Sequence, residues 1–411
     1  MKIKLKTFPV FLCILICLLL SSCYDAAEVE ETAYVIALGI DKGSNGGNIY
    51  TFQIAAPLGS SGSEEIGAFS DSGSENGDEN TEEDIMTADN KTVKNTVISA
   101  EDFYTARTLL ANYMSKNISL AHLKMIIISD ETANEIMAEH FEIFSSERQI
   151  RPATFIAVSK GRAEEYLKCV NPELEASTAK YYELSNTEKM LFYAPAKGLG
   201  SFMNDMKTFD KSGVLPLAVI SKSRKSAELD LSFSSEDGIK RRLSSSKTEM
   251  FGMGIFKDKH LVAVTGGEEA LIYNVLCGQT ESLIFSCDAE NGKKLFLKAD
   301  FLKKPCFKIS EKNGSLQIDV DIFINLKYCG TESKSKKSLE LGENALKEKI
   351  SRFLYLTSSE YNADILKLEK IAGRKYKTAG DAKNSDFEKK YKDCLFNVSV
   401  KTNNKIGSGI V

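Results

Sequence analysis

"SLQIDVDIFINLKY", residues 315–328, is the stretch that most clearly predicts a strand. Apolar residues occupy alternate positions, and most positions between them are polar. The apolar set consists of Leu316, Ile318, Val320, Ile322, Ile324 and Leu326. A period of two places alternate side chains on opposite faces of a strand. We therefore expect one face to pack on a core and the other to meet water, as in an antiparallel sheet.

The residues around this strand predict an α+β domain. Upstream, a hairpin is expected from strands 250–256 and 260–264, followed by a helix that starts at Gly267 and ends at Gly278. Three or four strands are expected after this helix. Gly252-Met253-Gly254 lies inside the first of the hairpin strands, where we expect it to allow close packing of backbones.

Downstream of residues 315–328, an amphipathic helix is expected over 338–356. Its inward residues are Leu346, Ile350, Phe353 and Leu354. Final strands are expected at 394–400 and near 406–411. This half is therefore predicted to be an antiparallel sheet with packed helices.

The N-terminal half begins with a predicted hairpin. Residues 31–40 are apolar on both faces and predict a buried strand, and residues 49–56 alternate as a second strand. Glycines and asparagines fill 43–48 between them, which indicates a turn.

Helices and strands then alternate along the chain. Ser99-Ala100-Glu101-Asp102 resembles a capping box before a helix. The core stripe of that helix is predicted to contain Phe103, Ala106, Leu110, Tyr113 and Met114. Further strands are expected at 123–128 and 154–159, with helices over 130–144 and 162–170. The first half is thus predicted to be mixed α/β.

Two polar segments interrupt the pattern. Residues 60–84 contain nine acidic residues and no basic ones, and such a composition predicts a disordered, solvated loop. The acidic positions do not match the spacing of a calcium-binding EF-hand loop. Residues 221–248 are serine-rich, and they are expected to be either the connection between the halves or an exposed β-hairpin.

The N-terminus has the pattern of an export signal. Three lysines precede an apolar run over 8–20, which is short for a membrane-spanning helix. Leu20-Ser21-Ser22-Cys23 then resembles a bacterial lipobox, in which the cysteine receives a diacylglyceryl group and becomes the new N-terminus. We therefore expect residues 1–22 to be removed and the mature chain to be anchored outside the cytoplasmic membrane through Cys23.

Composition excludes several classes of function. A net charge of −4 gives no electrostatic footprint for nucleic acid. The three histidines, His122, His140 and His260, are far apart in the sequence, and no C-x-x-C pair is present, so no zinc site or other metal or cofactor site is predicted. The sequence also lacks the nucleophile elbow, metalloprotease and P-loop motifs, so we do not expect an enzyme.

Six cysteines remain in the exported chain besides Cys23, and their disulfide state is open because six cysteines allow 15 connectivities. They are Cys169, Cys277, Cys287, Cys306, Cys329 and Cys394.

Several segments resemble the Ger(x)C family, the lipoprotein C subunits of spore germinant receptors. Members typically begin Cys-Trp-Asp, and this chain has Cys23-Tyr24-Asp25 before a strand that ends Gly39-Ile40-Asp41-Lys42. "SLAHLKMIIISDETA", "ERQIRPATFIAVSKGRAEEYL", "MGIFKDKHLVAVTGGEEALIYNVLCGQ" and "YNADILKLEKIAGRKY" resemble later family segments in the same order. Together they cover nearly all of the mature chain except the acidic loop.

The resemblance implies a non-enzymatic, multi-domain extracytoplasmic lipoprotein that assembles with receptor subunits A and B in the inner membrane of the spore. Tyr24, Asp25, Gly39 and Asp41 are then candidate structural or partner contacts. For Asp41 we favour a local role, in which its carboxylate accepts hydrogen bonds from amides of its own turn. A rim contact to a partner subunit is the other hypothesis.

The predicted division of the mature chain is an N-terminal region over 23–220, a connecting or small middle region over 221–248, and a C-terminal domain over 249–411. The alternatives to a receptor subunit are a solute-binding lipoprotein of a transporter and a surface hydrolase. The first would require repeated βαβ units in two lobes, whereas residues 280–330 predict an antiparallel meander.

Overall fold

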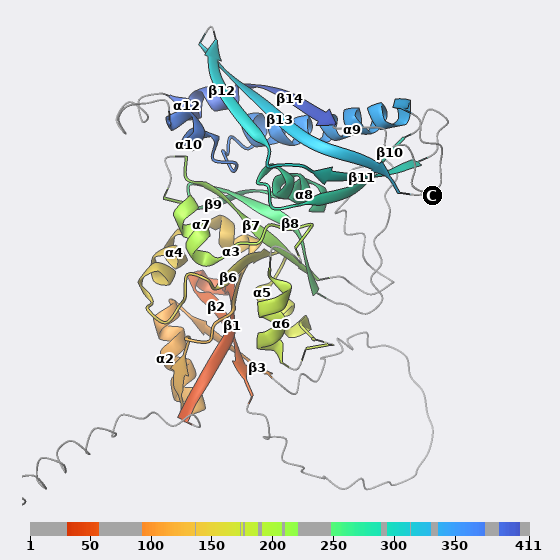
Figure 1. The fold of residues 1–411 in the computed structure, drawn as a ribbon. Helices are drawn as coiled ribbons and strands as arrows, with labels where there is room; N and C mark the ends of the chain where they lie inside the picture. The colour runs from red at the N-terminus through yellow and green to blue at the C-terminus, as the bar shows by residue number, and fades with distance from the viewer. Residues whose placement is uncertain are drawn as a thin grey trace, which may run out of the picture.

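The computed structural model contains two β-sheets, one above the other in Figure 1, with helices packed around both. The structure describes residues 31–56, 93–220 and 248–402, with short gaps at 136, 173, 176, 188–190, 208–209, 289–293, 313, 330–335 and 375–385. The predicted acidic loop, the serine-rich segment 221–247 and the predicted strand at 406–411 lie outside these residues. An α+β fold, as predicted, is confirmed.

The first sheet has nine strands in the order β3-β2-β1-β5-β6-β7-β8-β9, with β4 paired to β1. Strands β1, β5, β6 and β7 run parallel to one another, and the remaining neighbours along the path are antiparallel. The strands are β1 (Thr32–Lys42), β2 (Asn48–Ala55), β3 (Val93–Ala100), β4 (Asn117–Ser119), β5 (Met125–Ser129), β6 (Phe155–Ser159), β7 (Ser212–Ile220), β8 (Thr248–Lys257) and β9 (His260–Thr265).

Helices cover both faces of the first sheet. On one face, α2 (Phe103–Met114), α4 (Met137–Ser146) and α7 (Leu199–Asp205) share a hydrophobic core, and α3 (Asp130–Glu135) lies beside them. On the other face, α5 (Ala163–Cys169) and α6 (Thr178–Ser185) share a second core. Strands β5 and β6 are buried along their whole length because both faces are covered.

The second sheet follows the path β10-β11-β13-β12, with β14 also paired to β13. Its strands are β10 (Ser282–Asp288), β11 (Lys294–Phe301), β12 (Cys306–Lys312), β13 (Ser315–Tyr328) and β14 (Leu395–Thr402). The predicted alternation of β13 is confirmed, since Leu316 and every second residue to Leu326 are buried. The prediction of a wholly antiparallel sheet is wrong for β14, which runs parallel to β13.

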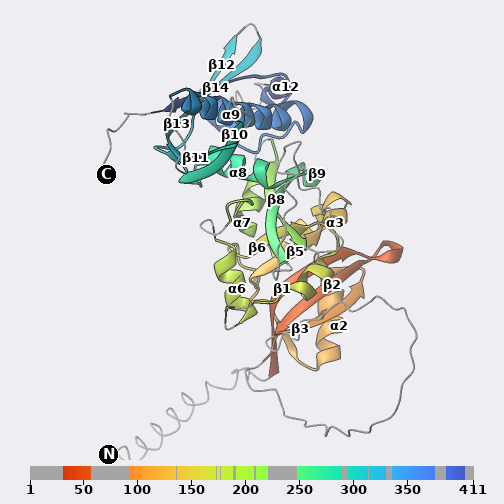
Figure 2. The same ribbon diagram turned by 90° about the vertical axis from the view of Figure 1, so that its right-hand side faces the viewer.

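Helices of the C-terminal part share one core with the second sheet. They are α8 (Gly267–Leu276), α9 (Lys336–Tyr355) with a π-helical turn at Leu356–Glu360, α10 (Leu368–Gly373) and α12 (Phe387–Lys392). Figure 2 shows α9 lying across the second sheet. The four residues predicted to face inward from α9, Leu346 to Leu354, are all buried.

The predicted start of α2 is wrong in detail. Its N-cap is Asp102, whose carboxylate accepts hydrogen bonds from the amides of Tyr104 and Thr105, whereas Ser99 belongs to β3. The first three residues of the predicted stripe are buried, but Tyr113 is 66% exposed. The capping-box pattern fails here because pairing with β2 extends β3 through Ala100.

Strands β7 and β8 are antiparallel neighbours, so the chain on either side of 221–247 lies in the same sheet. The predicted β8–β9 hairpin is confirmed, and it forms the edge of the first sheet. Gly252 has a φ of +100°, and a Cβ there would lie 2.3 Å from the Thr265 carbonyl oxygen. The close backbone packing expected at this glycine is therefore present.

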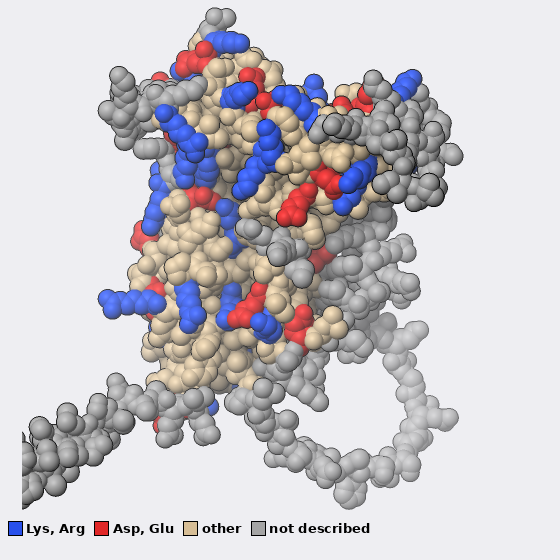
Figure 3. Space-filling view, viewed as in Figure 1, with Lys and Arg blue, Asp and Glu red and all other residues tan. Residues whose placement is uncertain are grey.

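The molecular face in Figure 3 carries intermingled Lys, Arg, Asp and Glu side chains. The described residues form many ion pairs that are at least partly exposed to solvent, such as Lys298–Asp300 and Lys168–Glu164. Exposed pairs of this kind contribute little stability.

Candidate functional site

The candidate contacts from the sequence fall into two groups. Cys23, Tyr24 and Asp25 lie outside the described residues. Gly39 lies in the middle of β1, where α5 crosses it. A Cβ at Gly39 would be 3.0 Å from Leu167 Cδ1 and 3.3 Å from the Ala163 Cβ, so this glycine permits close approach of helix to strand.

Asp41 caps α5 from a distant part of the chain. Its Oδ1 accepts a hydrogen bond from the Ala163 amide at 2.7 Å, and its Oδ2 accepts one from the Glu164 amide at 2.9 Å. The side chain is buried, and burial raises the pKa of the Asp41 carboxyl, although the two amide bonds act in the opposite direction. The prediction of amide partners is right in kind, but the prediction that they belong to its own turn is wrong.

This geometry sets an expectation for Asp41→Asn. Asparagine keeps one acceptor oxygen, but its Nδ2 group would lie opposite a backbone N–H of α5. Two hydrogen-bond donors would then face each other. We expect a loss of about 1–3 kcal/mol in the free energy of unfolding, the typical cost of an unsatisfied buried group. Urea unfolding of the full chain, followed by circular dichroism because the chain has no tryptophan, would measure it.

Asp102→Asn is the matched control. Asp102 caps α2 at a partly exposed position, where its Oδ1 accepts from the two backbone amides and its Oδ2 from the Thr105 hydroxyl, which can also accept a hydrogen bond from an asparagine amide. Asparagine serves as well as aspartate at an N-cap. Equal losses in the two variants would contradict the buried-cap account of Asp41.

A second buried carboxylate, Asp210, joins the two halves of the chain. Its Oδ1 lies 2.6 Å from Lys257 Nζ, at the end of β8, and its Oδ2 accepts a hydrogen bond from the Asp364 amide at 3.0 Å. Lys257 also pairs with Glu388 of α12 at 2.9 Å. Burial alone would lower the pKa of Lys257, but the two carboxylates outweigh it and raise that pKa.

Asp364 extends these contacts into the C-terminal core. It is fully buried, and its carboxylate accepts hydrogen bonds from the amides of Leu368 and Glu369, the first residues of α10. Burial, helped by the neighbouring Asp210 carboxylate, raises the pKa of Asp364 to about 7. Lys367 reaches back to the Ser212 carbonyl in β7. We call Asp210, Lys257, Asp364 and Lys367 the interdomain joint.

Asn274 of α8 makes another link between the halves. Its Nδ2 lies 3.2, 3.2 and 3.0 Å from the carbonyl oxygens of Leu191, Phe192 and Ala194. The amide of Gly252 also donates to the Tyr193 carbonyl, at 2.7 Å. The segment before α7 is therefore fixed to the C-terminal part.

Sequence reasoning missed the joint, although the segment containing Asp364 was among those used for the family resemblance. Asp210 and Asp364 are separated by 154 positions, and neither belongs to a pattern with a recognised spacing. The available signal was an aspartate shortly before a predicted helix, and that signal is too common to identify a joint.

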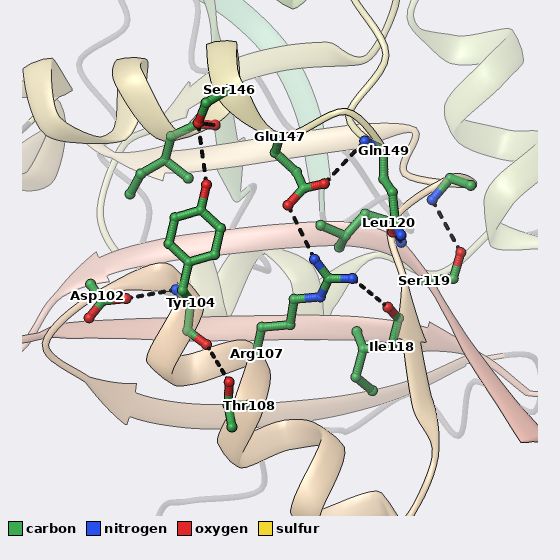
Figure 4. A network of polar contacts seen from close by, with 12 residues as sticks. Asp102, Tyr104, Arg107, Thr108, Ile118, Ser119, Leu120, Ser146, Glu147 and Gln149 are labelled. Atoms are coloured by element: carbon green, nitrogen blue, oxygen red, sulfur yellow. Dashed lines mark hydrogen bonds and ion pairs between the residues drawn. The ribbon is translucent and has the colours of Figure 1, made fainter.

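A polar network holds α2 against the end of α4 (Figure 4). Arg107 donates to Glu147 Oε2 at 3.1 Å and to the Ile118 carbonyl at 3.0 Å. Glu147 Oε1 accepts a hydrogen bond from the backbone amide of Gln149. The side-chain Oε1 of Gln149 in turn accepts one from the backbone amide of Leu120 at 2.8 Å. This network fixes the loop after α4 and the chain that leads into β5.

Two expectations from the sequence concern metal ligands and cysteines, and the described residues bear on both. No group of three His, Cys, Asp or Glu side chains could hold a metal ion in the described ranges. The six cysteines there are free thiols. Burial raises the pKa of Cys277 to about 11 and that of Cys394 to about 12, which disfavours the reactive thiolate.

Each of the three histidines contacts a neighbouring residue of the fold. The His140 ring lies 3.3 Å from the Tyr50 hydroxyl inside the core, and His260 contacts the Asn134 carbonyl. His122 packs edge-on against Tyr34. Within the described part of the chain, no helix is both long and apolar enough to cross a bilayer.

Comparisons with known proteins agree over both halves of the chain. A family model described as "Spore germination protein N-terminal domain" matches residues 25–220, and one described as "Spore germination B3/ GerAC like, C-terminal" matches residues 251–405. "Putative spore germination protein YfkR" of Bacillus subtilis (strain 168) is 24% identical over 324 residues, which cover 78% of this chain and 73% of that protein.

A solved structure, "Crystal Structure of the GerBC protein", aligns with a TM-score of 0.49 and 14% identity, covering 89% of this chain and 97% of that one. The family assignment rests on the two family models, which together match most of the chain. The chain belongs to the GerAC-like, or Ger(x)C, family of spore germination proteins.

Proposed function

We propose that this protein is the C subunit of a spore germinant receptor. In this role it is a non-enzymatic lipoprotein, held on the outer face of the cytoplasmic membrane, which becomes the inner membrane of the spore, by a diacylglyceryl group and further acylation, such as palmitate, at Cys23. It assembles there with membrane subunits A and B and takes part in nutrient-induced germination.

The observation that carries this proposal is the match of both family models, in the expected order, to residues 25–220 and 251–405. The interdomain joint adds physical support. The Asp210–Asp364 hydrogen bond and the Lys257–Glu388 ion pair tie the first sheet to the C-terminal helices. Such a connected body suits an assembly subunit.

A solute-binding lipoprotein of a transporter remains the alternative. That class typically folds as two lobes with parallel sheets, whereas β10 to β13 form an antiparallel sheet. The two roles also differ in what their loss does, since a receptor subunit is needed for germination and a binding protein is needed for uptake.

We expect an affinity-tagged copy, solubilised from spore membranes in mild detergent, to retain the A and B subunits. A tagged lipoprotein of unrelated fold is the control. Deletion of the protein should slow germination in at least one nutrient while uptake of that nutrient by growing cells stays normal. Impaired uptake, with germination intact and no A or B subunit recovered, would instead establish the transporter role.

A further inference from the structure

A cavity of about 480 Å³ lies at the amino ends of β5 and β6, beside α6. Three chain segments that form its walls are hydrogen-bonded together. The Phe155 amide donates to the Lys124 carbonyl at 2.9 Å, the Ile156 amide to the Lys197 carbonyl at 3.2 Å, and the Leu199 amide to the Thr154 carbonyl at 2.7 Å. The cavity therefore has a built frame, and its volume suits a small organic molecule.

Positive charge exceeds negative charge around this cavity. The described residues that line it include three cations, Lys124, Arg151 and Lys197, and one carboxylate, Glu183. Glu183 is already paired with Lys124 and Lys180, and Lys197 with Asp205 at 2.9 Å. Arg151 is exposed, and no described residue forms an ion pair or hydrogen bond with its guanidinium, so its five donors face solvent and are available to a ligand.

A second unused donor belongs to Asn186, which also lines the cavity. Its Nδ2 is shielded from solvent and has no hydrogen-bond partner among the described residues. Buried donors without partners are uncommon in folded proteins and call for an explanation. A terminal amide turns readily about χ2, so an oxygen atom placed in the cavity can supply the missing acceptor.

The groups around the cavity are held in place from both sides. The network of Figure 4 fixes Glu147 and Gln149, shortly before Arg151, and the Thr154 amide closes a turn on the Arg151 carbonyl at 2.9 Å. On the opposite wall, Asn274 fixes the segment that leads to Lys197. Preorganised donors lose little entropy when they bind a ligand.

We propose that this cavity binds a small organic anion, with a carboxylate or phosphate oxygen accepting hydrogen bonds from Arg151 and Asn186. Arg151 supplies the net positive charge, because Lys124 and Lys197 are paired with Glu183 and Asp205. The apolar parts of Leu123, Phe155 and Tyr182 contact the carbon skeleton. The Tyr182 hydroxyl donates to Gln53 and is not available to the ligand. This binding site is independent of the role as a receptor subunit.

Isothermal titration of the full chain in detergent, at constant ionic strength, tests the proposal with malonate, inorganic phosphate and the neutral analogue malonamide. We expect saturable binding of at least one anion and none of malonamide. Saturation by malonate alone would identify a carboxylate site, and saturation by phosphate alone a phosphate site. Arg151→Gln should weaken binding about tenfold or more, since a charge-assisted hydrogen bond is lost.

Arg148→Gln is the matched control, because Arg148 is exposed like Arg151 and lies in the same loop, but it is not among the described residues that line the cavity. We expect the affinity of this variant to stay within about twofold of the wild type, since a charge that does not contact the ligand acts on it only through screened solvent. Glu183→Gln removes the one carboxylate among the described lining residues and should leave binding equal or tighter. The proposal is overturned if neither anion saturates, or if Arg148→Gln weakens binding as much as Arg151→Gln does.

Discussion

Asp210→Ala is expected to lower the free energy of unfolding by about 3–5 kcal/mol, the usual cost of removing one partner of a buried ion pair. Lys257 would lose its 2.6 Å contact and keep only Glu388, whose side chain is 54% exposed. The Asp364 amide, also buried, would lose its acceptor. Both effects act at the joint between the first sheet and the C-terminal core.

Urea unfolding of the full chain by circular dichroism would measure this loss. Asp288→Ala is the control, because Asp288 forms an ion pair with Lys294 in which the aspartate side chain is 72% exposed. We expect that variant to lose less than about 1 kcal/mol. Asp210→Asn should fall between the two, since asparagine keeps an acceptor for the Asp364 amide but removes the charge opposite Lys257.

The number of transitions in the unfolding curve gives a second test of the joint. If the joint couples the two halves, the wild-type chain unfolds in one transition and Asp210→Ala separates it into two. A single, unshifted transition in Asp210→Ala would mean that water already reaches the joint, and would remove the physical support that the joint gives to an assembly role.

Local patterns in the sequence were sufficient for most individual elements. Strand β13 was predictable because each apolar residue from Leu316 to Leu326 has the same buried environment. The β1–β2 and β8–β9 hairpins were predictable because short polar turns separate their strands. In all of these, the residues that determine the structure are close together in the sequence.

Pairings between distant segments were not predictable in the same way. The helices α9 and α12 follow β13 in the sequence and precede β14, and their packing determines where the chain re-enters the sheet. No pattern within β14 itself specifies that it runs parallel to β13. Asp41 illustrates the same limit at a candidate site. Its sequence neighbourhood indicates a turn, but the amides that it accepts from are 122 and 123 positions away.

Cys23→Ala is expected to move the protein from the membrane fraction to the soluble fraction in cells that lack the A and B subunits. Each buried methylene of an acyl chain contributes about 0.8 kcal/mol, so loss of the lipid removes the attachment almost completely. The fold should be unaffected, because Cys23 precedes Thr32, where the first strand, β1, begins. Fractionation and a circular dichroism melt of the released protein would test both statements.

Cys169→Ala is the control, since Cys169 is half-buried at the end of α5, and its loss should leave the protein in the membrane fraction. If Cys23→Ala also stays there after high-salt washing, the apolar segment 8–20 must be retained as an anchor, and the lipoprotein proposal fails.

We expect the same variant to behave differently when A and B are present. Two attachments to one membrane act together, because the first raises the effective concentration for the second. If the subunits bind this protein, part of Cys23→Ala should then remain in the membrane fraction, and the difference between the two backgrounds measures their contribution. Full release in both backgrounds would show that the lipid alone holds the protein, and would argue against stable assembly with A and B.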